Sequence, residues 1–263
     1  MEPAQLPSTI PRALARALEG VVFDVDDTVT RDGRLEREAY DAMWSLADAG
    51  LALAVVTGRP LGWTDVLARH WPVRVAVGEN GAGWAWRDGD AVREGYYETE
   101  TERARSRATV ERVLERVARD VPEARVAGDQ RARRCDAAFD VGETLHVAAE
   151  RVDAIVRVVE AEGARALVST VHVHVVAGSW DKGSGALRAI GDALGREVAP
   201  QQWLFVGDSG NDAAAFACFP NAAGVANVRP WLDRLPSPPR WIASADRGRG
   251  FAEIADAVLA GRR

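Results

Sequence analysis

Two short apolar runs joined by one helical pattern constrain the fold of this chain more than any other feature. The runs are 21–25 (VVFDV) and 51–56 (LALAVV), and a helical spacing of apolar residues fills 35–50 between them. A strand, a helix and a strand with short joints predict a right-handed parallel crossover. Towards the other end, a helical pattern, the apolar run 203–206 (WLFV) and a helix over 211–219 repeat the arrangement. We therefore expect an α/β fold in which both ends of the chain form one doubly wound, mainly parallel, Rossmann-like core sheet.

The middle of the chain has a different pattern. Short strands are indicated at 84–86, 93–97, 136–141, 166–169 and 172–176. Two helical patterns lie among them, and the first opens with Thr99 and Glu102, which fit a capping box. This mixture predicts an α+β domain spanning 82–178, inserted into a core domain made of 1–81 and 179–263.

Charge, cysteine content and hydropathy exclude several classes of protein. The formal net charge of −6, without a long basic block, disfavours nucleic-acid binding. Cys135 and Cys218 form no CxxC pair, which argues against a disulfide framework or a structural zinc site and favours a reducing cytoplasm. No apolar run approaches the ~20 residues of a membrane span. We expect a cytoplasmic monomer or small homo-oligomer with neither nucleic acid nor membrane as partner.

The segment Asp24-Val25-Asp26-Asp27-Thr28 ends the first apolar run. A period of two sends the side chains of Asp24 and Asp26 to the same side, at the strand end where open parallel sheets bind ligands. Two carboxylates so close repel each other, and a divalent cation relieves that repulsion. One of them can then act as a nucleophile while the other transfers protons. The alternative is a solvated acidic turn.

The segment Thr57-Gly58-Arg59 ends the second apolar run. A hydroxyl beside the exposed N–H groups of a glycine turn makes a small cradle for an anion. By itself this signal is weak, and a plain turn explains it equally well.

Lys182 is the only lysine in a chain whose other basic residues are all arginine. A compact ammonium with three donors is not replaced well by the planar fork of arginine, so a specific need for a point charge is indicated. Chance is the alternative.

The segment 207–212 (GDSGND) follows the apolar run 203–206 and opens a helix. Asp208 and Asp212 could simply cap that helix. Two aspartates and Asn211 packed into a glycine turn fit oxygen coordination of Mg²⁺ better.

In this order the four segments resemble the motifs of the haloacid dehalogenase (HAD) superfamily of aspartate-nucleophile phosphatases. DVDDT is similar to its first motif, the Thr57 turn to its second, Lys182 to its third and GDSGND to its fourth. The resemblance spans most of 21–230 and includes GENGA (78–82) and SWDKGSGA (179–186), which look like the lead-in and exit of an inserted cap domain.

The resemblance implies a mechanism and roles for particular residues. Asp24 would attack phosphorus to form an aspartyl-phosphate, and Asp26 would protonate the leaving oxygen and then activate water. Mg²⁺ would be held by Asp24, the carbonyl of Asp26 and Asp208, with Asp212 or Asn211 in support. The phosphoryl oxygens would be bound by Thr57, Gly58 and Lys182. Oxygen ligands accept Mn²⁺ as well as Mg²⁺, and we expect Mg²⁺.

The position of the insertion resembles the type IIB cap, and the fourth motif looks closest to that of sucrose-phosphate phosphatases. Trehalose-phosphate and mannosyl-phosphoglycerate phosphatases are relatives, and a generic Cof-type phosphatase fits equally. We therefore expect an Mg²⁺-dependent phosphoric monoester hydrolase acting on a small metabolite, with a sugar phosphate favoured. Candidate substrate contacts are Arg59, Trp180, Arg131, Arg133, Arg134, His146, His172 and His174. Ordinary roles compete for each of them: a solvated face for arginine, packing for histidine and a hinge plug for Trp180.

Two other functions fit the same motifs. A phosphomutase of the same superfamily would return the phosphoryl group to the sugar, but the Thr57-Gly58-Arg59 turn looks like the hydrolase version. A non-catalytic sensor of phosphorylated metabolites would be expected to lack at least one of Asp24, Asp26, Lys182 and Asp208, and all four are present.

Overall fold

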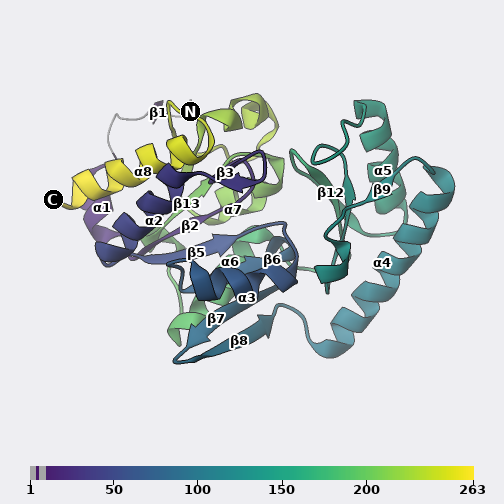
Figure 1. Ribbon diagram of the computed structural model, residues 1–263, viewed down its shortest axis with the longest axis horizontal. Helices are drawn as coiled ribbons and strands as arrows, with labels where there is room; N and C mark the ends of the chain where they lie inside the picture. Colours follow the sequence, from purple (N-terminus) through teal and green to yellow (C-terminus); the bar gives the residue numbers. More distant parts are fainter. Residues whose placement is uncertain (1–3, 6–9) are drawn as a thin grey trace.

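The computed structural model describes residues 4–5 and 10–263. Within them, a large sheet lies on one side of the molecule and a smaller, helix-backed sheet on the other (Figure 1). In spatial order the nine strands of the large sheet are β1 (Ala4–Gln5), β15 (Trp241–Ile242), β14 (Asn221–Gly224), β13 (Trp203–Gly207), β2 (Gly20–Phe23), β5 (Ala52–Val56), β6 (Val75–Gly78), β7 (Gly83–Asp88) and β8 (Ala91–Tyr96). Pairing is parallel from β1 to β6 and antiparallel between β6, β7 and β8. The predicted mainly parallel sheet is confirmed.

Helices bury both faces of the large sheet, as a doubly wound fold requires. One apolar cluster joins the sheet to α1 (Arg12–Ala17), α2 (Arg37–Asp48), α3 (Leu61–His70) and α8 (Arg247–Arg262). A second cluster joins the opposite face to α6 (Lys182–Leu194) and α7 (Ala213–Cys218). Among the described residues, none of the helices has both the length and the apolar character needed to cross a membrane.

The inserted domain is the smaller layer in Figure 1. Its antiparallel sheet has the order β11 (Arg165–Val168), β12 (His172–Val176), β10 (Ala137–Asp140) and β9 (Arg125–Val126). Two helices, α4 (Glu100–Asp120) and α5 (Ala149–Ala161), pack on it around a separate apolar cluster that includes Val113, Phe139 and Ile155. The capping box of Thr99 and Glu102 is present at the start of α4. We refer to this domain as the cap.

Strands β7 and β8 pair with the sheet of the core and not with the sheet of the inserted domain. The sequence analysis assigned both strands to the insertion, but they extend the core sheet by antiparallel pairing next to β6. Trp84 of β7 is fully buried in the core cluster against α6, while β8 forms a half-exposed edge with polar side chains. That polar edge explains why the hairpin resembled part of a separate module. On this pairing we propose that the cap begins after Tyr96 and not at residue 82.

Candidate active site

The predicted motifs converge at the carboxyl ends of three adjacent strands. Asp24 follows β2, Thr57 follows β5 and Asp208 follows β13, and these strands are neighbours in the order β13-β2-β5. Lys182 is the first residue of α6, which packs on the same sheet. Neighbouring parallel strands bring residues far apart in sequence to one edge of the sheet, where ligands bind in such folds.

Lys182 lies between two carboxylates beneath the surface. Its Nζ donates to Oδ1 of Asp24 at 2.8 Å and to Oδ1 of Asp212 at 2.7 Å, and the residue is 1% exposed. Asp181 is the N-cap of α6, and its carboxylate accepts the N–H groups of Gly183 and Ser184. These bonds fix the first turn of the helix, which carries the lysine. Burial acts to lower the pKa of Lys182, but Asp212 and Asp24 outweigh it, so the pKa is raised and the ammonium is kept.

Asp24, Asp208 and Asp212 form a buried cluster that fits a divalent cation. One carboxylate oxygen of each lies within 4.8 Å of the others. Burial, Asp212 and Asp26 raise the pKa of Asp24 to about 7 against the opposing effect of Lys182, and burial, Asp212 and Asp24 raise the pKa of Asp208 well above its ordinary value. Three buried carboxylates facing one ammonium leave negative charge without compensation, and carboxylate oxygens are preferred ligands of Mg²⁺.

Two of these carboxylates are oriented by further hydrogen bonds. Oδ2 of Asp212 accepts the N–H groups of Asp208 at 2.8 Å and Ser209 at 3.1 Å. Asp208 accepts the hydroxyl of Thr28 at 3.2 Å and the side-chain amide of Asn227 at 3.0 Å. Asn227 was not singled out from the sequence, because a lone asparagine in a loop carries no pattern.

Asp26 is held by Arg59, the third residue of the second motif. The guanidinium donates from Nε to Oδ2 at 2.8 Å and from Nη2 to Oδ1 at 2.7 Å, so both carboxylate oxygens are engaged. The N–H of Arg59 donates to Oγ1 of Thr57 at 3.0 Å. Gly58 between them leaves room for the cap, because a Cβ there would lie 2.7 Å from Nε2 of His174.

Cap residues cover Asp24 and Asp26. Asp24 and Asp26 line a cavity of only about 10 Å³ that is covered by 169–172 and His174 and flanked by Asn211. A space of that size holds about one water molecule, so the cap must move for a phosphoryl group to enter. The cap histidines His172 and His174 therefore face the site, as the sequence analysis considered.

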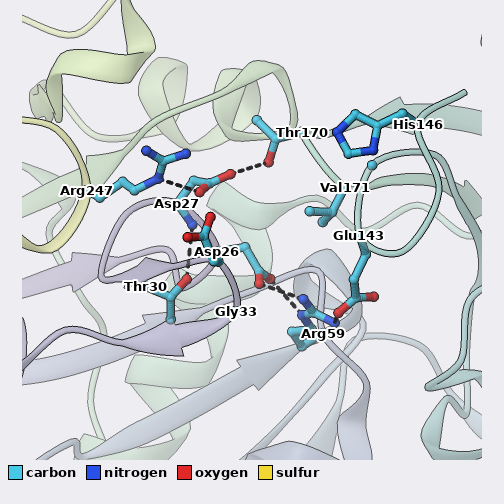
Figure 2. A pocket seen from close by; sticks show the side chains of 12 residues that line it. Asp26, Asp27, Thr30, Gly33, Arg59, Glu143, His146, Thr170, Val171 and Arg247 are labelled. Carbon is cyan, nitrogen blue, oxygen red and sulfur yellow. Dashed lines mark hydrogen bonds and ion pairs between the residues drawn. The ribbon is translucent and has the colours of Figure 1, made fainter. Parts of the chain in front are cut away.

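A larger cavity of about 400 Å³ opens beside Asp26 between the core and the cap. Figure 2 shows Arg59 between Asp26 and Glu143, and Asp27 between Thr170 of the cap and Arg247 of α8. Further lining residues are Thr30, Asp32, Gly33, Gly142, His146 and Val171. His146 was a candidate substrate contact, and the structure places it in the wall of this cavity.

The other candidate contacts lie elsewhere. Trp180 is 1% exposed, donates from Nε1 to the carbonyl of Glu79 at 3.0 Å and packs in an apolar cluster at the base of the cap. It is a hinge plug. Arg133 is also buried and binds Asp136 and the carbonyl of Gly58, each at 2.9 Å. The other two candidate arginines, Arg131 and Arg134, are exposed.

Glu79 is a structural residue that the sequence analysis missed. Its fully buried carboxylate accepts four backbone N–H groups, from Leu61 of the core and from 134–136 of the cap, at 2.6–2.9 Å. It thereby fixes the cap segment 134–136 to the core. The GENGA segment marked this position, but not its partners.

Comparison with known proteins agrees with this architecture. The model of the sucrose-6F-phosphate phosphohydrolase family matches residues 19–232. No curated protein sequence matches the chain.

Solved structures give the same fold. A Thermoplasma acidophilum protein superposes with a TM-score of 0.70 at 21% identity, covering 92% of this chain and 98% of that one. The sucrose-phosphatase of Synechocystis, solved with sucrose and phosphate, has a TM-score of 0.66 at 17% identity, covering 94% and 98%. A phosphatase of the haloalkanoate superfamily from Bacteroides thetaiotaomicron has a TM-score of 0.62 at 16% identity, covering 97% and 98%. At these identities the superpositions establish the fold, while the family match spans most of the chain. The protein therefore belongs to the sucrose-6F-phosphate phosphohydrolase family, among the type IIB phosphatases of the HAD superfamily.

Proposed function

We propose that this phosphoric monoester hydrolase is Mg²⁺-dependent, acts on a sugar phosphate and works through an aspartyl-phosphate at Asp24. The observation that carries the proposal is a buried group of three residues: Asp24 and Asp208 at adjacent strand ends and Lys182 at the start of α6. Asp26 and Asp24 line the same small cavity. Asp24, Asp208 and the carbonyl of Asp26, with Asp212 or Asn211 in support, would hold Mg²⁺, and the bound ion would supply neutralisation of charge on the phosphoryl group.

The residues divide the reaction into two steps. In the first, a carboxylate oxygen of Asp24 bonds to phosphorus, the bond from phosphorus to the leaving oxygen breaks, and Asp26 gives its proton to that oxygen. In the second, Asp26 takes a proton from water, the water oxygen bonds to phosphorus, and inorganic phosphate leaves while Asp24 is restored. Lys182, the hydroxyl of Thr57 and the N–H of Gly58 stabilise the phosphoryl oxygens in both steps.

The cavities beside Asp26 support a sugar as the leaving group. The cavity of about 400 Å³ is lined by carboxylates, arginine, threonine and histidine, which are suited to binding hydroxyl groups. A neighbouring cavity of about 160 Å³ shares Asp26 and Arg59 and carries Trp63 and Trp71, whose faces suit the apolar side of a sugar ring. The family match favours sucrose phosphate among the sugar phosphates to be tested.

The test is phosphate release from a panel of monoesters with Mg²⁺ and with EDTA. The panel contains sucrose, trehalose and hexose phosphates, two glycosyl-phosphoglycerates and phosphoglycolate. We expect metal-dependent release with a clear preference for one sugar phosphate, and no turnover by a folded Asp24→Asn variant. Weak release from every ester would contradict the sugar preference. Transfer of phosphate back to sugar without release would favour a mutase.

We also propose a cytoplasmic location, on the grounds that Cys135 and Cys218 are both free thiols and that a reducing compartment keeps them so. A monomer or small homo-oligomer remains our expectation for its assembly, and light scattering of the purified protein measures it.

A further inference from the structure

We infer that Arg59 and Glu143 form a positioning relay that couples docking of the cap to the orientation of Asp26. The inference rests on the proposed function, in which Asp26 transfers the proton to and from the leaving oxygen. It assigns a role to Glu143, a cap residue outside the four motifs, and to the part of Arg59 that faces away from Asp26.

On the core side, Arg59 determines where both oxygens of Asp26 lie. Its Nε and Nη2 bind Oδ2 and Oδ1 at 2.8 and 2.7 Å in the parallel, two-bond geometry that guanidinium and carboxylate groups favour. The arginine side chain is only 4% exposed, so it has little freedom to turn away. The side chain of Asp26 therefore follows any movement of this guanidinium.

On the cap side, the remaining amino group of Arg59 is bound by carboxylates. Nη1 donates to Oε1 of Glu143 at 2.7 Å and to Oδ2 of Asp129 at 3.4 Å. Glu143 is itself fixed, because Asp140 accepts its N–H at 2.9 Å and Nε2 of His172 lies 3.0 Å from its Oε2. Figure 2 shows Arg59 in the middle of this chain, with Asp26 on one side and Glu143 on the other.

Movement of the cap must change this arrangement. The cavity over Asp24 and Asp26, at about 10 Å³, is too small for a phosphoryl group, so the cap lifts before substrate binds. Lifting of the cap loop that carries Glu143 removes this carboxylate from Nη1, whereas Asp26 stays bound to Nε and Nη2. Docking of the cap brings the carboxylate of Glu143 back to Nη1, so that all three nitrogens of the guanidinium are bound. The effect on rate can be large, because a misplacement of about 1 Å in a catalytic group can cost on the order of 100-fold. Asp26 stays paired with Arg59 in both states, and closure of the cap adds the contact with Glu143 that fixes the position of this pair.

The relay predicts a dependence on the leaving group that a purely structural contact does not. Glu143→Gln keeps the shape of the side chain but weakens its hold on Nη1, and Glu143 is 32% exposed at its side chain, so the variant should fold. We expect kcat to fall on the order of tenfold for phenyl phosphate, whose phenoxide is the more basic leaving group and which, like p-nitrophenyl phosphate, has no sugar hydroxyl group for Glu143 to bind. For p-nitrophenyl phosphate, whose leaving group needs little protonation, we expect a loss below about twofold.

Thr170→Val is the matched control. Thr170 also joins the cap to the core, through a hydrogen bond of 2.8 Å from its Oγ1 to Oδ2 of Asp27, but the bond does not pass through Asp26. Weaker docking alone should lower kcat for both substrates by the same factor. Arg59→Lys, which removes the two-bond geometry at Asp26, should give the same leaving-group dependence as Glu143→Gln, and a larger one.

The outcomes separate the two proposals. If the native enzyme releases phosphate and Glu143→Gln lowers kcat equally for both substrates, as Thr170→Val does, the relay is wrong and the proposed function stands. If the native enzyme releases phosphate from no ester, the proposed function itself is wrong. Unequal losses in Glu143→Gln and Arg59→Lys, with equal losses in Thr170→Val, support the relay.

Discussion

At the scale of single residues, the surroundings of Lys182 explain why this position carries a lysine when the other basic residues counted as Lys or Arg are all arginine. Its Nζ fits between Asp24 and Asp212 at distances of 2.8 and 2.7 Å in a site with almost no solvent. A guanidinium is wider than an ammonium and presents its donors in a plane, so it cannot occupy the same point between two carboxylates. The geometry favours the specific need for a lysine over chance.

Lys182→Arg should therefore lose both activity and stability. We expect kcat to fall by at least about 100-fold, because a misplaced cation no longer stabilises the phosphoryl oxygens. The free energy of unfolding should fall by about 1–3 kcal/mol, as overpacking of a close-packed site typically costs. Arg107→Lys, an exchange of the reverse direction at an exposed position of α4, is the control and should change both quantities little. Normal turnover by Lys182→Arg would contradict the assigned role.

At the scale of elements, the cap helix α4 is defined by local sequence. Oγ1 of Thr99 accepts the N–H of Glu102 at 3.4 Å, and the carboxylate of Glu102 accepts the N–H of Thr99 at 2.8 Å. These reciprocal bonds satisfy N–H groups that the first turn of a helix leaves free. The start of the cap's longest helix is thus encoded within four residues.

Thr99→Ala should destabilise the cap domain by about 1 kcal/mol, which is the usual cost of losing the side-chain hydrogen bond at the N-terminus of a helix. Unfolding in urea, followed by far-ultraviolet circular dichroism, measures the change. Thr101→Ala is the control, since Thr101 is exposed in the same first turn and alanine is the better helix former, so its loss should not destabilise. Equal destabilisation by the two variants would show that the hydrogen bond from the N–H of Glu102 to Oγ1 of Thr99 contributes nothing to stability.

At the scale of the whole molecule, the buried carboxylates link folding, pH and metal. Without metal, burial first and then Asp212 and Asp26 raise the pKa of Asp24 from 3.8 to about 7. Between these values the folded protein retains a proton that the unfolded chain has lost. The stability of the metal-free protein should therefore fall as pH rises through this window, because the unfolded state binds fewer protons.

Mg²⁺ should reverse that loss, and more strongly at high pH. A metal ligand must be deprotonated, so below about pH 7 Mg²⁺ has to displace a proton, and its affinity should fall up to about tenfold per pH unit. We expect Mg²⁺ to raise the melting temperature, relative to EDTA, by more at pH 8 than at pH 5.5. Asp24→Asn removes one of the two carboxylates with a raised pKa, the other being Asp208, and should reduce the difference. An equal rise at both pH values in the native protein would exclude the linkage.

The sequence by itself determined the parallel core, the place of Asp24, Thr57, Lys182 and Asp208 at one edge of it, and the presence of an inserted α+β domain. These features follow from local patterns, since apolar runs predict strands and parallel strands bring their carboxyl ends together. The family match agrees with them.

Only the tertiary structure decided which strands β7 and β8 pair with, that Trp180 is buried with its Nε1 bonded to the carbonyl of Glu79, and which residues join the cap to the core. Membership of β7 and β8 in the core sheet depends on which strand they pair with, and a polar edge strand does not encode its neighbour. Arg59 and Glu143 are 84 positions apart and meet because two separately packed domains come into contact. Such a contact depends on the relative placement of whole elements, and no local periodicity or motif spacing records it.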